Sequence, residues 1–541
     1  MPGWRNGRRR RLKIFREISR AGSSPAPGTN TFMNKYYVTI GLEIHAELNT
    51  KSKMWCSCAN VPLEDTPNKN VCPICMAHPG TLPVANHEAL KKMIAIGLAT
   101  RNKKEKENGT YKNISNFIEF DRKNYFYPDI PKAYQITQYK YPIINGGEIV
   151  ANVNSMVNGE AVSKSISISL TRIHLEEDTA KSTHDKGAYT LIDFNRAGVP
   201  LMELVTDANT YDTVEEAAIA SGEFARELRR ILRTLDASDA DMEKGQMRVE
   251  ANISVTLDKC VYGTKCEVKN INSFRSVEDA IRYEVDRHID LIESGKQVTQ
   301  ETRGWDENKR ETFSQRKKEN AHDYRYFPDP DLPKLYTYEL FNINSIMASL
   351  PILPEERRNL FSEIGLQNKQ ITQLLDDVTL GNYYLSGISK LENKMDKISL
   401  ANYLLTDIVG QSPDFLPDIL HITDMILMIK NGDLSSRGAK DLISILIKNK
   451  DISNNKTAIN IAEENNLIQK NDEETLIDIV NKTIKENTKQ WTEFIGTKSI
   501  EGKEIVSGND KLLMYFVGQC MKESKGSGNP SMFIKIINDK K

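Results

Sequence analysis

The feature that most constrains the fold is a change in hydrophobic periodicity along the chain. From Tyr36 to about Val205, and again at 246–271, apolar and polar residues alternate as they do in β-strands. Beyond the Pro-rich run at 327–333, apolar residues recur at helical spacing. The chain has 541 residues, more than one hydrophobic core normally holds. We therefore predict an α+β fold, in which a domain with a mostly antiparallel sheet precedes two all-α domains.

Changes of pattern also suggest domain boundaries. The predicted domains are a sheet domain at 33–335, a helical domain at 336–420 and a helical tail domain at 421–541. The sheet domain should contain a long helix from Tyr211 to Leu235. This segment has a helical apolar stripe, and Thr213 with Glu216 has the spacing of a capping box.

Residues 1–32 differ in composition from the rest of the chain. They hold eight basic side chains and one acid, Glu17. An organelle transit peptide or a basic RNA-binding arm would have this composition. We favour a third interpretation, a tRNA gene translated by mistake upstream of Met33, because the residues from Gly22 to Pro25 can be encoded by a T-arm-like sequence. On this interpretation residues 1–32 are a non-native or disordered extension.

The overall composition narrows the class of protein. The net charge is −1, so any contact with nucleic acid has to use a local patch. Seven cysteines, an odd number, favour a reducing compartment over a secreted disulfide framework. No apolar run approaches the roughly 18 residues that a membrane span needs. We therefore expect a cytoplasmic protein without a membrane partner.

Three predicted strands carry polar side chains on one face, because alternate residues of a strand share a face. In the first, from Val38 to Leu48, the even positions are apolar. The polar positions of the three strands are Glu43, His45 and Glu47; Arg248, Glu250 and Asn252; and Lys265, Glu267 and Lys269. These faces could be solvated outer surfaces of an antiparallel sheet. They could instead form one concave floor for Mg-nucleotide chemistry, since carboxylates hold a hard cation and Lys or Arg neutralises phosphate.

An acidic run ends the strand pattern at 165–178. The apolar positions change face near Thr171, which predicts a bulge or a strand end. Glu176, Glu177 and Asp178 follow His174 and Leu175 directly. Three adjacent carboxylates repel one another unless they are exposed, paired or bound to a cation. The run is therefore either an exposed acidic turn or part of a cation site.

Four cysteines have the spacing of a metal site. Cys56 and Cys58 form one close pair, and Cys72 and Cys75 form a second pair after thirteen intervening residues. Two thiolate pairs joined by a short loop suit tetrahedral zinc, although a redox pair or an empty site would have the same spacing. Four thiolates leave no open coordination position. We therefore expect a structural Zn²⁺.

Two segments, 120–128 and 323–327, interleave basic and aromatic residues. Such segments grip phosphates and stack on single-stranded bases such as a tRNA end, but they also occur in ordinary cores. The sequence has neither a G-x-x-x-x-G-K-[ST] loop nor a G-x-G-x-x-G fingerprint, so a nucleotide would need another kind of site. It also lacks a Gly/Ser-rich amidase segment, so glutamine hydrolysis is not visibly encoded.

Taken in order, these segments resemble the GatB family, the B subunits of tRNA-dependent amidotransferases. The matching stretches are Ile40–His45, Phe120–Pro128, His174–Lys181, Asn195–Glu203, Gly263–Phe274, Gln300–Arg303, Asp323–Pro328 and Val517–Lys522. The resemblance extends from about residue 36 to about residue 536. It implies that the sheet domain is a cradle with a kinase site and that the tail domain grips tRNA.

The resemblance also implies functional residues. It assigns Glu43, His45, Glu177 and Glu267 to a catalytic magnesium and phosphate site, with Glu250 and Asp193 as further acids. Cys56, Cys58, Cys72 and Cys75 match the family's zinc cysteines. Lys265 and Lys269 share the strand phase of Glu267, and we expect them near phosphate.

The implied activity is ATP-dependent phosphorylation of the side-chain carboxylate of Glu-tRNA(Gln), Asp-tRNA(Asn) or both, followed by amidation with ammonia. An amidase-type glutaminase, the A subunit, would supply the ammonia, and a small C subunit would complete a heterotrimer. The implied cofactors are ATP, Mg²⁺ and structural Zn²⁺. Two rivals remain open: a non-catalytic tRNA-binding scaffold, and a free-standing zinc hydrolase, which an all-cysteine ligand set disfavours.

Overall fold

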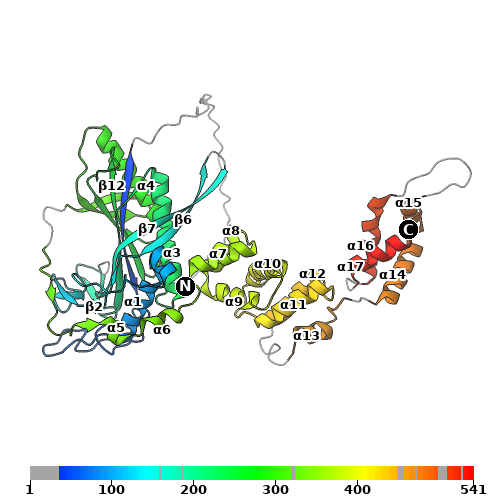
Figure 1. Cartoon of the computed structure of the whole chain (residues 1–541), viewed down its shortest axis with the longest axis horizontal. Helices are drawn as coiled ribbons and strands as arrows, with labels where there is room; N and C mark the ends of the chain where they lie inside the picture. The colour runs from blue at the N-terminus through cyan, green and yellow to red at the C-terminus, as the bar shows by residue number, and fades with distance from the viewer. Residues whose placement is uncertain are drawn as a thin grey trace, which may run out of the picture.

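The computed structural model describes residues 36–157, 160–184, 187–317, 323–448, 456–469, 472–496, 509–524 and 528–541. The predicted extension at 1–32 lies outside these residues. A sheet-containing domain is followed by two helical bodies arranged in a row (Figure 1). The predicted α+β class is therefore confirmed, and each part has a separate hydrophobic core.

The first domain is built on one large sheet with the strand order β15-β14-β13-β12-β1-β10-β7-β5, in which β11 also pairs with β1 and β6 with β7. The strands of this sheet are β1 (Tyr37–Glu47), β5 (Ile144–Asn145), β6 (Glu148–Val157), β7 (Glu160–Glu177), β10 (Pro200–Thr206), β11 (Asn209–Tyr211), β12 (Met247–Thr256), β13 (Cys266–Ile271), β14 (Glu301–Asp306) and β15 (Glu311–Lys317). Neighbouring strands are antiparallel except for β13 and β14, which are parallel. The predominantly antiparallel sheet matches the prediction.

Smaller elements surround this sheet. The short strands are β2 (Phe117–Ile118), β3 (Asp121–Asn124), β4 (Tyr134–Thr137), β8 (Lys181–Thr183), β9 (Leu191–Asp193), β16 (Phe327–Pro328) and β17 (Leu335–Tyr336). The helices of this part are α1 (His87–Ala99), α2 (Lys103–Asn108), α3 (Val214–Thr234), α4 (Phe274–Glu293), α5 (Thr337–Leu340) and α6 (Ile343–Ala348). Strands β16, β3 and β4 form a three-stranded sheet that joins segments about 200 residues apart in sequence.

The central strand β1 has the predicted alternation. Its even positions, from Val38 to Ala46, are at most 3% exposed and belong to the first core, on the side covered by α3 and α4. Its odd positions therefore all face the opposite side of the sheet. The predicted irregularity at Thr171 is also present, because the β7–β10 register steps from Arg172 to Leu170 and leaves Thr171 without a paired residue.

Helix α3 begins where the capping pattern predicted. Thr213 accepts a hydrogen bond of 3.0 Å from the backbone N–H of Glu216. The Glu216 carboxylate pairs with Lys164. Thus one of the two hydrogen bonds of the expected capping box is present, and the acid that would make the second is used to tie the helix to β7.

The sequence predicted that the first domain ends just after the Pro-rich run at 327–333, but the structure continues this domain beyond it. Phe327–Pro328 forms the strand β16 at the edge of the small sheet, a position where proline is tolerated because one strand side needs no partner. Beyond it, Phe341, Ile343 and Ile346 are buried in the first core. The first domain therefore continues to about Leu353, which also packs against that core.

The remaining chain forms two helical bodies. The second core includes residues from Phe361 to Ala462, with Leu467 and Ile468 packed against it, so it extends past the expected boundary at residue 420. Its elements are α7 (Pro354–Ile364), α8 (Asn368–Asp376), α9 (Val378–Ile388), α10 (Lys394–Asn402), a π-helical turn (Tyr403–Ile408), α11 (Ile419–Asn431), α12 (Ser436–Lys448) and α13 (Ala458–Glu464). The third core lies within α14 (Glu473–Glu486), α15 (Thr488–Ile495), α16 (Leu513–Glu523) and α17 (Pro530–Asp539).

An ion-pair network connects the first and second bodies. Glu227 of α3, which is 4% exposed, accepts hydrogen bonds from Arg230 at 3.1 Å and from Arg358 of α7 at 2.5 Å. Arg230 also donates to Asp376 at 2.7 Å. None of the described helices is long and apolar enough to cross a bilayer.

Candidate functional site

A cluster of three carboxylates lies on the polar face of the central strands. Glu43 of β1 is directly opposite Glu250 of β12, and Glu267 follows on β13. One carboxylate oxygen of each lies within 4.8 Å of those of the other two. Lys269 lies 2.6 Å from Glu250 and 3.6 Å from Glu267, and Thr302 of β14 donates a 2.7 Å hydrogen bond to Glu267. The register of adjacent strands thus brings together three acids and one amine.

The electrostatics of this triacid cluster favour a bound cation. Burial raises the pKa of Glu43 to about 7, and the neighbouring charges of Glu203 and Glu250 act in the same direction. The pKa of Lys269 is also raised, because the acids Glu250 and Glu267 outweigh the effect of its burial. Carboxylate oxygens are the ligands that Mg²⁺ prefers. The donor set therefore fits Mg²⁺.

A second cluster, of two histidines and two glutamates, adjoins the first along the same face. Glu203 of β10 lies 3.2 Å from His45 and 3.4 Å from His174, and Glu176 lies 3.8 Å from each histidine. Burial on its own would lower the pKa of His174, but Glu203 and Glu176 outweigh it and raise that pKa to about 9. The two histidines in turn hold the pKa of Glu203 well below its usual value, despite burial. A compact set of alternating charges results.

Lys123 of β3 faces this histidine–glutamate cluster from the small sheet. Burial lowers its pKa, but the charges of Glu176 and Glu203 outweigh this and raise the pKa above its ordinary value. Its amine lies 5.3 Å from the ring centre of Tyr324 and 5.9 Å from that of Tyr125. The two aromatic–basic segments noted in the sequence therefore lie side by side, and together they form one wall of the site.

Further along the face, Asp178 lies between two arginines. Arg248 donates a hydrogen bond of 3.2 Å to it, and the Arg196 guanidinium lies 3.4 Å away. These charges lower the pKa of Asp178 although burial opposes the shift. Burial, followed by the charge of Asp178, raises the pKa of the neighbouring Glu47 to about 7.

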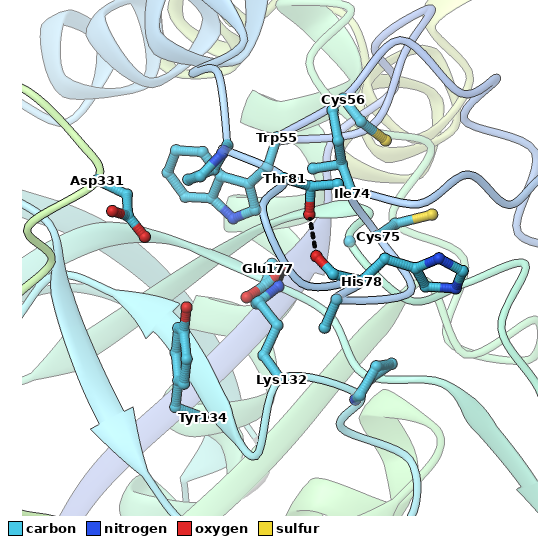
Figure 2. A pocket seen from close by; sticks show the side chains of 14 residues that line it. Trp55, Cys56, Ile74, Cys75, His78, Thr81, Lys132, Tyr134, Glu177 and Asp331 are labelled. Carbon is cyan, nitrogen blue, oxygen red and sulfur yellow. Dashed lines mark hydrogen bonds and ion pairs between the residues drawn. The ribbon is translucent and has the colours of Figure 1, made fainter.

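Glu177 does not join either cluster. It is one residue from Glu176 on β7, so its side chain points to the other face of that strand. There it lies 2.6 Å from Lys132 and accepts a 2.9 Å hydrogen bond from the backbone N–H of Ile136. It lines a cavity of about 210 Å³ together with Tyr134, Trp55 and part of the cysteine loop, as Figure 2 shows. Burial raises the pKa of Glu177, and Lys132 opposes this shift.

Lys265 lines a different cavity, of about 270 Å³, at the other end of the polar face. Glu43 belongs both to this cavity and to the triacid cluster. Asp193 lies in neither place. It is the last residue of β9, where it accepts hydrogen bonds from the backbone N–H groups of Asn68 at 2.9 Å and Asn195 at 3.0 Å.

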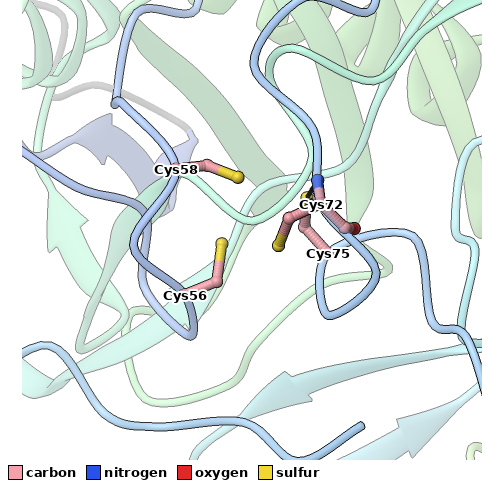
Figure 3. Close-up of side chains that lie close together, drawn as sticks. All are labelled: Cys56, Cys58, Cys72 and Cys75. Carbon is pink, nitrogen blue, oxygen red and sulfur yellow. Dashed lines mark hydrogen bonds between the residues drawn. The ribbon is translucent and has the colours of Figure 1, made fainter.

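The four expected zinc cysteines come together as predicted from their spacing. Their four sulfur atoms all lie within 4.8 Å of one another. Figure 3 shows the pair Cys56 and Cys58 on one loop facing the pair Cys72 and Cys75 on another. A hydrogen bond between the side chains of Cys56 and Cys75 lowers the pKa of Cys75 to about 5, although burial acts to raise that pKa. Lys53, which is fully buried, lies 3.9 Å from the Cys75 sulfur. A four-thiolate zinc site carries excess negative charge that such an amine would offset, so the residues present fit Zn²⁺.

Two residues of the site, Glu203 and Arg196, were not singled out from the sequence. His174, Glu176, Asp178 and Lys123 lay in segments for which the sequence left a structural alternative open. A signal for Glu203 does exist, because it is the only acid in the β10 segment, whose other residues are apolar or neutral. A lone acid in a strand that is buried on both faces is costly unless it is paired.

Comparison with known proteins identifies the family. The model of the GatB/GatE catalytic domain matches residues 38–341, and that of the GatB domain matches residues 410–540. The B subunit of the aspartyl/glutamyl-tRNA(Asn/Gln) amidotransferase of Brevibacillus brevis is 37% identical over 519 residues, which cover 94% of this chain and 99% of the relative.

Two organellar relatives agree with this assignment. The B subunit of the chloroplastic/mitochondrial glutamyl-tRNA(Gln) amidotransferase of Ostreococcus lucimarinus is 38% identical over 524 residues, covering 94% of this chain and 97% of the relative. That of Sorghum bicolor is 36% identical over 516 residues, covering 93% and 87%. The chain therefore belongs to the GatB family of amidotransferase B subunits.

Proposed function

We propose that the polar face of the cradle domain transfers the γ-phosphoryl group of ATP to the side-chain carboxylate of Glu-tRNA(Gln), Asp-tRNA(Asn) or both. The observation that carries this proposal is the adjacency of the triacid cluster and the histidine–glutamate cluster, which meet at the Glu43–His45 stretch of β1. The triacid cluster suits a cation and the phosphates of ATP. The histidine–glutamate cluster presents fixed charges to the acceptor carboxylate.

The reaction needs an activated carboxylate, because oxide is a very poor leaving group. The bond from the γ-phosphorus to the β,γ-bridging oxygen breaks, a bond from that phosphorus to a carboxylate oxygen forms, and ADP leaves. Ammonia then attacks the carbonyl carbon of the acyl phosphate, and inorganic phosphate leaves as the amide forms. Phosphoryl transfer mainly requires in-line positioning and neutralisation of charge, both of which a rigid strand floor can supply.

In this proposal Glu43, Glu250 and Glu267 hold Mg²⁺, which supplies charge neutralisation at the phosphates when it is bound. Lys269 and Lys265 would neutralise phosphate oxygens. His45, His174 and Glu203 orient the acceptor carboxylate, and Lys123 attracts it. The sequence predicted four residues at the magnesium site. In this proposal Glu43 and Glu267 have that role, and His45 positions the acceptor. The acid next to His45 is Glu176, whereas Glu177 has no part in this proposal.

The proposed assembly is a heterotrimer. A glutaminase of the amidase type would release ammonia, and a small third protein would connect the two larger ones. The tail helices α14–α17 would grip the tRNA. Zn²⁺ at Cys56, Cys58, Cys72 and Cys75 would hold two loops together, without a part in the chemistry. We place this assembly in the bacterial cytoplasm.

The test uses the complex of this chain with its partner subunits. Glu-tRNA(Gln) and Asp-tRNA(Asn) are supplied separately with ATP, Mg²⁺ and ammonium, and both ADP and amidated aminoacyl-tRNA are measured. We expect ADP and product in equal amounts, and a loss of both in Glu267→Gln but not in Glu88→Gln, an exposed acid on α1. A complex that binds tRNA without turning over ATP would favour the scaffold alternative, and product formed without ATP would favour a hydrolase.

A further inference from the structure

The connection between β9 and β10, residues 194–199, is tied to the cysteine loop, residues 56–75, by hydrogen bonds in both directions. The backbone N–H of Asn70 donates a 2.8 Å hydrogen bond to the side chain of Asn195, which in turn donates one of 2.8 Å to the carbonyl oxygen of Thr66. Both Asn70 and Thr66 lie in the stretch that separates the two cysteine pairs. A shift of one cysteine pair relative to the other should therefore move this connection.

The Lys53 side chain makes a further tie from the protein interior. It is fully buried, and its amine donates a 3.1 Å hydrogen bond to the carbonyl oxygen of Phe194 and lies 3.9 Å from the Cys75 sulfur. No carboxylate among the residues that the structure describes forms an ion pair with this amine. A buried ammonium is costly unless a negative charge compensates it. The thiolates supply that charge, because four of them carry more negative charge than one Zn²⁺ neutralises.

The same connection carries Arg196 to the polar face of the sheet. The Arg196 guanidinium lies 3.4 Å from Asp178, and the backbone N–H of Gly198 donates a 2.9 Å hydrogen bond to the carbonyl oxygen of Asp178. Arg196 also borders a cavity of about 680 Å³ together with Glu47. One short connection is thus bonded to the cysteine loop at Asn195 and to the polar face at Arg196 and Gly198.

We propose that Lys53 is a positioning residue that couples the zinc site to the polar face of the cradle. Its ammonium stabilises the metal-bound thiolates, and its hydrogen bond to Phe194 holds the β9–β10 connection so that Arg196 stays against Asp178. Residues that contact metal ligands from outside commonly determine how tightly the metal is held. The inference rests on the zinc site of the proposed function and gives this site a second task, because it fixes one end of the polar face as well as the two cysteine pairs.

Lys53→Met tests the charge, because methionine keeps most of the unbranched shape of the lysine side chain and removes the ammonium. In the assembled complex, release of zinc to a chromogenic chelator should be at least about tenfold faster in Lys53→Met than in the native protein. Lys51→Met, the same substitution at an exposed position two residues earlier, should release zinc within about twofold of the native rate. An unchanged release rate in Lys53→Met would overturn the inference.

A double-mutant cycle with Cys75→Ala separates the proposed role of Lys53 from a packing role. Cys75→Ala removes the sulfur beside the amine, so that the buried charge of Lys53 loses its nearest compensation. Lys53→Met should therefore lower the thermal midpoint when Cys75 is present, and leave it unchanged or raise it in the Cys75→Ala background. Equal lowering in both backgrounds would mean that Lys53 only fills space or bonds Phe194, and would overturn the inference.

Hydrogen exchange measures the coupling without any substitution. The backbone N–H groups of Ala197 and Gly198, which donate to Phe194 and Asp178, should exchange at least about tenfold faster after a chelator has removed the zinc. The amides of β1, which is paired on both sides, should change by less than about twofold. Unchanged exchange at Ala197 and Gly198 would overturn the coupling, and native protein without metal would refute the zinc site together with this inference. Because none of these readouts is amidation, the kinase proposal is tested independently.

Discussion

Glu284 should stabilise the cradle domain more than any acid on its surface. Its side chain is fully buried on α4, where it accepts hydrogen bonds from Arg287, at 2.7 Å and longer, and from Thr312, and lies 3.0 Å from Arg303. The pKa of Glu284 falls from 4.5 to about 2, because these hydrogen bonds and charges, with that of His288, outweigh its burial. A pKa lowered this far corresponds to about 3 kcal/mol of unfolding free energy near neutral pH.

The sign of this effect gives it a pH signature. A carboxylate with a depressed pKa contributes its full stability above the unfolded-state value of 4.5 and loses it as the pH falls toward 2. Glu284→Gln should therefore lower the unfolding free energy of the cradle by about 3 kcal/mol at pH 7.5, and by less at pH 4. Urea unfolding, followed at the buried Trp305 of β14, measures both values.

The matched control for Glu284 is Asp286→Asn, an exposed acid on the same helix, which should change stability by less than about 0.5 kcal/mol. A loss below about 1 kcal/mol in Glu284→Gln would refute the reasoning. So would a loss that grows as the pH falls, since that is the opposite sign.

Three further predictions concern the histidine–glutamate cluster, the cysteine site and the connection between domains. Glu203→Gln should reduce ATP-dependent amidation at least 100-fold, because the two histidines lose their shared counter-charge, while tRNA binding measured by filter retention stays unchanged; weakened tRNA binding would indicate a structural role. The native protein should contain about one Zn²⁺ per chain by plasma mass spectrometry, and Cys72→Ser should release it and lower the thermal midpoint; metal-free native protein of unchanged stability would contradict this. Arg358→Ala should lower the free energy of unfolding by about 1.5–3 kcal/mol, because it removes a charged hydrogen bond to the buried Glu227. It should also broaden the distribution of interatomic distances measured by small-angle scattering. An unchanged distribution would mean that other contacts fix the first and second bodies relative to each other.

The sequence predicted the parts of the site that depend on one strand at a time. Glu43 and His45 could be assigned to a polar face because the even positions of β1 are all apolar, and burial of one face determines which residues share the other. The cysteine array was likewise predictable, because its ligands are paired locally. Both predictions rest on spacing within a single segment.

The parts that depend on strand order were not predictable from one sequence. Glu203 enters the site only because β10 lies between β1 and β7, and no local pattern specifies that order. The side chain of Glu177, which the family resemblance assigns to the magnesium site, lies on the other face of β7 from His174 and Glu176, because residues two apart in a strand share a face. The Pro-rich run was misleading for a similar reason, because its pairing partner β3 is about 200 residues away.

The central position of β1 also limits how this chain can change in evolution. It is paired on both sides, with β12 along nearly its whole length and with β10 from Glu43 to Glu47. A one-residue insertion or deletion before Glu43 would exchange the two faces and turn Leu42 and Ile44 toward the polar floor. Substitutions can therefore accumulate in this strand, but its length cannot drift. Homologous chains should differ in length at the connections between strands, while the number of residues from Val38 to Leu48 stays constant.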